Sequence, residues 1–103
     1  MPNYRQLHEE SLAQNQAKRY RDLQRSGELK AHLDALEKDA KDLHAQIVKD
    51  LRQSHPFNPV EWKNEQRAWE AWLHRSAKEV VLNDLVLVPD RETEQAMRDG
   101  YVD

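Results

Sequence analysis

Cysteine is absent from this chain, and glycine nearly so, with two residues in 103. Without cysteine there is no disulfide framework and no thiolate metal site, as is usual for proteins of a reducing compartment. So little glycine leaves few positions for the phosphate-binding and oxyanion loops of many enzymes. No nucleophile elbow, phosphate loop or H-E-x-x-H zinc motif occurs. We therefore expect no enzymatic activity, no catalytic residues, no cofactor and no metal.

Long apolar segments are also missing, since the longest run is the four residues Leu85 to Val88. This excludes an obvious signal peptide or membrane span, so we expect a cytoplasmic protein with no membrane partner. The net charge of −3 argues against a polycation that coats nucleic acid. With 38% hydrophobic and 34% charged residues, the composition favours amphipathic helices, whose apolar stripes a homodimer could cover.

The few glycines and prolines divide the chain into helical segments, and almost no period-two alternation lies between them. We predict an all-α fold, with one domain over residues 1–103. The expected architecture is a small three-helix antiparallel bundle or helical hairpin with a short C-terminal helix or tail. Residues before Glu9 are expected to be frayed or packed separately, and Ser26-Gly27 to form a turn. The predicted segments are helices at about 9–25, 28–52 and 59–85, and a tail at 86–103 with a short helix near 91–99.

The segment 28–52 has the most regular pattern. Its apolar residues follow one another at spacings of three and four, which places them on one narrow face of a helix. Such a seam is typical of helices that pack at a shallow angle. The seam consists of Leu29, Leu33, Leu36, Ala40, Leu43, Ile47 and Leu51.

The segment 59–85 begins with a strong start signal and carries all three tryptophans. Asn58 suits the N-cap, Pro59 the first helical position, and Glu61 the capping box, while Phe57 and Trp62 could form a hydrophobic staple. Counted from Trp62, the helical period places three further residues on one core-facing stripe. Those residues are Trp69, Leu73 and Val80.

Trp72 lies off this stripe, so a contact with a partner is a real alternative to burial. Within the residues that follow, the runs 80–82 and 85–88 are apolar on all sides, and this end is predicted either to be buried throughout or to leave the helix as an extended segment. The candidate partner-binding residues are Trp72, Val81, Leu85 and Val86.

A basic stripe provides the alternative, a nucleic-acid interface. Its spacing of three and four would align cations along one helix face, where they could contact successive phosphates. No recognition-helix signature accompanies it, and a solvated face next to the end of a helix accounts for it as well. The residues are Lys18, Arg19, Arg21 and Arg25.

Two Glu–His pairs occur at helical spacing, Glu28 with His32 and Glu70 with His74. Facing helices could join such pairs into a metal site, but we interpret them as surface pairs because His74 lies off the apolar stripe. The remaining histidines have no partner at ligand spacing; they are His8, His44 and His55.

Several short stretches resemble the TnpV family of small transposon-encoded proteins. They are Ser26-Gly27-Glu28-Leu29 with Leu33, then Ala40, and later Ala77-Lys78-Glu79-Val80-Val81 with Asn83 and Leu85. The resemblance implies a mobile-element setting and no particular site residues.

These observations favour a small non-enzymatic helical protein that docks on another protein or on itself. An accessory protein of a mobile element or phage, such as an inhibitor of host defence, fits this description. The alternative is a nucleic-acid-binding accessory or regulatory protein that uses the basic stripe.

Overall fold

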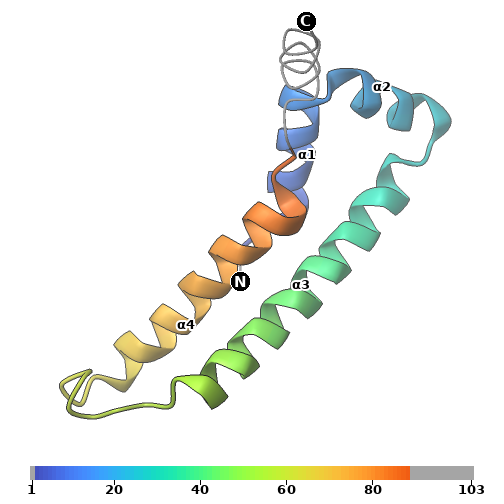
Figure 1. Cartoon of the computed structure of the whole chain (residues 1–103). Coiled ribbons are helices and arrows are strands. Elements are labelled where there is room, and N and C mark those ends of the chain that lie inside the picture. Colours follow the sequence, from blue (N-terminus) through green and yellow to red (C-terminus); the bar gives the residue numbers. More distant parts are fainter. Residues whose placement is uncertain (1, 89–103) are drawn as a thin grey trace, which may run out of the picture.

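The computed structural model describes residues 2–88, and these residues form helices and no strand. The long helices α3 and α4 lie side by side and antiparallel, α1 packs near the end of α4, and α2 joins α1 to α3 (Figure 1). The all-α prediction is confirmed, but residues 2–88 form four α-helices where three were predicted. The elements are α1 (Tyr4–Asn15), α2 (Ala17–Ser26), α3 (Leu29–Ser54), α4 (Gln66–Val81) and a π-helical turn, η1 (Leu82–Val86).

The first helix begins five residues earlier than the predicted start at Glu9. The Asn3 side-chain oxygen caps it by accepting the backbone N–H of Gln6 at 3.1 Å. Tyr4 is only 1% exposed and packs in a core cluster with Val81 and Val86. Of the two alternatives predicted for the first residues, frayed or packed separately, fraying is wrong, because contacts with distant residues bury Tyr4.

The predicted N-terminal helix 9–25 is interrupted at Gln16, whose φ of −138° and ψ of 56° are not helical. Neither glycine nor proline stands there, so the sequence gives no local warning of the break. The turn predicted at Ser26-Gly27 is confirmed. Gly27 has a φ of 76°, and the N–H groups of Gly27 and Glu28 donate to the carbonyls of Gln24 and Leu23.

The seam predicted along residues 28–52 is confirmed in α3, where all seven of its apolar residues are buried or partly buried. Two further residues, His44 and Val48, are buried beside it. The buried face of α3 is therefore wider than the seam, because α3 packs against α1 on one side and α4 on the other.

The helix predicted from Pro59 begins only at Gln66. Asn58 does cap a turn, since its side-chain oxygen accepts the N–H groups of Val60 and Glu61 at 2.9 and 3.3 Å. That turn ends at once, because Lys63 and Asn64 adopt φ values of 51° and 63°. Their N–H groups donate to the carbonyls of Val60 and Pro59, which is the hydrogen-bond pattern of a helix C-terminus.

One residue of the predicted core stripe of α4 lies on the surface instead. The predicted stripe placed Val80 in the core, but Val80 is 40% exposed and Val81 is fully buried. The buried face of α4 is built by Trp69, Leu73, Ala77 and Val81.

Of the two alternatives predicted for residues 80–88, burial on every side is wrong, because Val80 and Leu87 are exposed, and an extended departure from the helix is confirmed at Leu87. Helix α4 widens into η1, where the N–H of Leu87 donates to the carbonyl of Leu82 at 2.7 Å, and Leu87 itself is extended. Val88 then binds α1 through its N–H to the Ser11 hydroxyl and through its carbonyl to the Asn15 amide. The predicted tail helix at 91–99 lies outside the described residues.

Two core clusters stabilise the helices, and Ile47 packs against both. One joins α1, α3 and η1 around Tyr4, and the other joins α3, α4 and the α3–α4 loop around Trp69. Over residues 2–88 no helix is long and apolar enough to cross a membrane.

Candidate functional site

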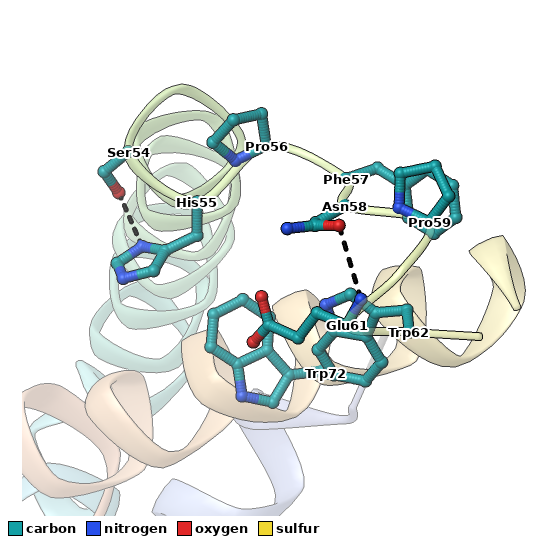
Figure 2. Close-up of a pocket in the computed structure, with 9 residues that line it drawn as sticks. All are labelled: Ser54, His55, Pro56, Phe57, Asn58, Pro59, Glu61, Trp62 and Trp72. Atoms are coloured by element: carbon teal, nitrogen blue, oxygen red, sulfur yellow. Dashed lines mark hydrogen bonds between the residues drawn. The ribbon is translucent and has the colours of Figure 1, made fainter. Parts of the chain in front are cut away.

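A cavity of about 750 Å³ opens where the chain turns from α3 to α4. Figure 2 shows that side chains from the end of α3, the loop and α4 converge on this cavity. We call it the aromatic pocket. Its lining residues are Ser54, His55, Pro56, Phe57, Asn58, Pro59, Glu61, Trp62 and Trp72.

Several contacts hold the loop in this shape. The indole N–H of Trp69 donates to the His55 carbonyl at 3.0 Å, which fixes the point where the chain leaves α3. The Phe57 ring packs on Trp69 with centroids 5.6 Å apart. With the Asn58 cap, these contacts fix the first half of the loop against α4, so the cavity is formed before any partner binds.

Two indole rings form the apolar wall of the pocket. The centroids of Trp62 and Trp72 lie 5.8 Å apart with their planes tilted by 45°, and His55 meets Trp72 edge-on at 5.7 Å. Both tryptophans are partly buried. Trp72 therefore lies at the rim of a pocket, the position where a partner contact was predicted.

Trp62 was predicted to be an ordinary core residue; it is partly buried and packs against the cluster around Trp69, but it also forms part of the pocket wall, which was not predicted. The cap signal at Asn58 is real, but it starts a single turn that turns Trp62 toward Trp72. Asn64 is a residue type that tolerates a positive φ, but Lys63 is not, so the sequence marks the end of that turn only weakly and the pocket was not recognised from the pattern. The spacing of Pro56 and Pro59 indicates a turn there, without revealing a cavity.

The other candidate partner residues belong to the core. Val81 and Val86 are completely buried, and Leu85 is partly buried against the same cluster. The prediction that these three form a docking surface is therefore wrong. The apolar run 80–88 closes the bundle over α1 and α3 instead.

The basic stripe is exposed on α2, a helix with no buried residue. Lys18, Arg21 and Arg25 make no ion pair with any residue in the range 2–88. The Arg19 guanidinium donates to the Gln16 side chain at 3.3 Å. The structure thus leaves these cations accessible to solvent, as the nucleic-acid alternative requires.

Four histidines form two hydrogen-bonded pairs that the sequence did not reveal. The Nε2 atoms of His8 and His32 lie 2.9 Å apart, and so do His44 Nε2 and His74 Nδ1. Neither predicted Glu–His pair makes a hydrogen bond or ion pair, since His32 and His74 bond to histidines of other helices. Spacing along one helix cannot show such contacts.

Each pair continues into the interior. His8 Nδ1 lies 2.7 Å from the Val86 carbonyl, so it donates there and its Nε2 accepts from His32. His44 Nδ1 lies 2.6 Å from the Tyr4 hydroxyl, which is buried. Burial lowers the pKa of His8, His32 and His44, and for His32 and His44 the paired histidine lowers the pKa further.

Glu70, the predicted partner of His74, binds another helix. Its carboxylate accepts two hydrogen bonds from the Arg52 guanidinium at 2.7 and 3.0 Å, and that guanidinium lies 5.3 Å from the Trp69 ring centroid. The hydrogen bonds from Arg52 lower the pKa of the Glu70 carboxyl, and His74 still contributes to this lowering. Within residues 2–88 no group of three histidine or carboxylate side chains could hold a metal ion.

Comparison with known proteins identifies the family. A search of curated proteins and a search of solved structures each find no significant match. The family model described as transposon-encoded protein TnpV matches residues 1–86, which is most of the chain. The chain therefore belongs to the TnpV family of transposon-encoded proteins.

Proposed function

We propose that this chain is a non-enzymatic docking protein of a mobile element, and that it binds another protein through the aromatic pocket. The observation that carries the proposal is the preformed cavity of about 750 Å³ walled by Trp62 and Trp72. Tryptophan is the residue most enriched where protein interfaces concentrate their binding energy. A cavity that already exists lowers the entropy cost of binding, so a short segment of a partner can bind usefully.

The surroundings of the pocket support the same function. Val60, next to the rim, is 88% exposed, and the two prolines of the loop make the rim stiff. An exposed apolar residue beside an open aromatic wall is typical of a docking surface. Ser54 and His55 meet in the lining, with the Ser54 hydroxyl 2.9 Å from His55 Nδ1, but that hydroxyl donates to the Asp50 carbonyl at 2.9 Å, so the pair lacks the arrangement of an activated nucleophile and the pocket is better suited to binding.

Trp72→Leu is expected to weaken capture of the protein partner at least tenfold while the protein stays folded, because it removes the indole wall but keeps an apolar side chain. The measurement is a quantitative pull-down from the source cell with nuclease added, with circular dichroism to show that the fold is intact. A matched control is Leu87→Ala, since Leu87 is exposed and far from the pocket along α4 and η1. Equal capture by the wild type and Trp72→Leu would contradict the proposal.

A second candidate function is nucleic-acid binding through α2, favoured by its exposed and unpaired cations. Changing Lys18, Arg21 and Arg25 together to alanine should then abolish binding to duplex DNA. If each cation contacts one phosphate, the affinity of the wild type should fall roughly 40-fold between 50 and 200 mM salt. Fluorescence anisotropy with labelled DNA measures both effects. Absence of binding at low salt would eliminate this candidate.

A further inference from the structure

The aromatic pocket combines an apolar wall with one negative charge. Glu61 lines the cavity, and in Figure 2 its side chain extends from the loop toward Trp72. Glu61 is exposed and makes no ion pair with any described residue. None of the residues that line the pocket is lysine or arginine. The carboxylate is therefore free to accept hydrogen bonds from a ligand that enters the pocket.

The faces of indole rings attract cations, and a carboxylate nearby adds hydrogen bonds and charge. Phosphate groups are repelled by the same carboxylate, so a nucleic acid does not suit this pocket. A purely apolar side chain would fill the wall but leave Glu61 partly desolvated without a partner, which costs free energy. The chemistry of the lining thus selects a cation with a flat or apolar surface.

The protein already uses this combination on the neighbouring part of α4. There Arg52 lies over the Trp69 ring and donates both hydrogen bonds to the Glu70 carboxylate. The aromatic pocket has the same pair of an indole, Trp72, and a carboxylate, Glu61. The place that corresponds to Arg52 is open space in the pocket. A planar guanidinium can stack on an indole and bind a carboxylate with two hydrogen bonds, whereas an ammonium cannot do both equally well.

We propose that the aromatic pocket binds an arginine side chain of a partner protein, with the guanidinium between the indoles and the Glu61 carboxylate. This inference rests on the proposed docking function and names the chemistry that the pocket recognises. Trp62 and Trp72 supply the stacking surface, Glu61 supplies the charge, and the stiff loop keeps them in place. The partner segment presents the arginine in an accessible, extended or loop conformation.

The test uses the three indole N–H signals in nitrogen-15 NMR spectra of the full chain. The probe is the peptide acetyl-Gly-Arg-Gly-amide, and its control carries the neutral isostere citrulline in place of arginine. The arginine peptide should shift the Trp62 and Trp72 signals with a dissociation constant in the millimolar range. The Trp69 signal should stay in place, because its N–H is already bonded to His55.

Glu61→Gln should lower the affinity for the arginine peptide about fivefold, as expected for a partly exposed charged contact. Glu79→Gln changes the net charge equally and lies outside the pocket, so it should bind like the wild type. Three results would overturn the proposal: equal shifts with citrulline, no effect of Glu61→Gln, or self-association that Glu61→Gln abolishes, since a second copy would then be the occupant.

The docking function can be judged separately. If the arginine peptide does not bind but Trp72→Leu still abolishes capture of the protein partner, docking stands and the arginine inference fails. If the peptide binds and capture of the protein partner does not depend on Trp72, the docking proposal fails.

Discussion

Lowering the pH from about 7 to about 5 should remove a large part of the free energy of unfolding, because three histidines are held neutral inside the native protein. Burial lowers the pKa of His8, His32 and His44 below the ordinary value of 6.5. The hydrogen bond from His8 to the Val86 carbonyl opposes this effect on His8 but is the smaller influence. Nearby Arg19 adds to the lowering for His8 and His32.

The direction of the pH effect on stability depends on whether the native or the unfolded protein binds more protons. Below about 6.5 the unfolded chain takes up protons at these histidines while the native protein does not, so acid favours unfolding. Stability is therefore complete above about 6.5 and falls as the pH drops through that value toward the lower native pKa values. Each proton of difference changes the free energy of unfolding by about 1.4 kcal/mol per pH unit. Three such protons set an upper limit of about 4 kcal/mol per unit, against about 5–10 kcal/mol in total for a small domain.

The geometry of the two histidine pairs explains why the native protein does not readily take up further protons there. Each gap of 2.9 Å between paired histidine nitrogens holds one hydrogen, so a doubly protonated pair would face two N–H groups across it. Thermal melts followed by circular dichroism from pH 7.5 to 4.5 measure the effect. His55→Gln should keep the slope of the wild type, because His55 is exposed. A melting temperature that stays constant between pH 7 and 5 would contradict the account of the pairs.

Tyr4→Ala should lower the free energy of unfolding by about 3–5 kcal/mol, the usual cost of deleting a buried aromatic ring. Tyr4 is buried against Val81 and Val86, and its hydroxyl lies 2.6 Å from His44 Nδ1. Tyr4→Phe keeps most of the packing but leaves the buried His44 nitrogen without its partner. That variant should lose about 1–3 kcal/mol.

Urea denaturation separates the two contributions, since a shift of the midpoint at constant slope reports stability alone. Tyr20→Phe is the matched control. The Tyr20 hydroxyl bonds to Glu9 near the surface, so its loss should cost under about 1 kcal/mol. If Tyr4→Phe were as stable as the wild type, the Tyr4–His44 hydrogen bond would contribute nothing to the fold.

The sequence predicted the features that depend on local chemistry. Gly27 ends α2 because it adopts a positive φ, and the seven apolar residues of α3 lie on its buried face because they follow the helical period. Asn58 caps its turn because an amide oxygen suits the free N–H groups there. These rules act over a few residues and can be read from the chain.

The features that the sequence did not predict depend on distant contacts. Tyr4 lies in the segment that was predicted to be frayed or packed separately, but Val81 and Val86 bury it in the core. His44 has no partner at metal-ligand spacing along its own helix, yet Tyr4 and His74 from two other helices complete its hydrogen bonds. Lys63 has no intrinsic preference for a positive φ, and its conformation shifted the start of α4 and opened the aromatic pocket.

Hydrogen exchange measured on the complex with the captured protein partner tests the central claim most directly. Docking at the aromatic pocket predicts that binding slows exchange in residues 54–62 and in the part of α4 around Trp72. The same experiment with Trp72→Leu should show no slowing there at equal concentrations. Slower exchange confined to residues 17–26 of α2, with no change around the pocket, would contradict the claim and would support a function of the basic stripe.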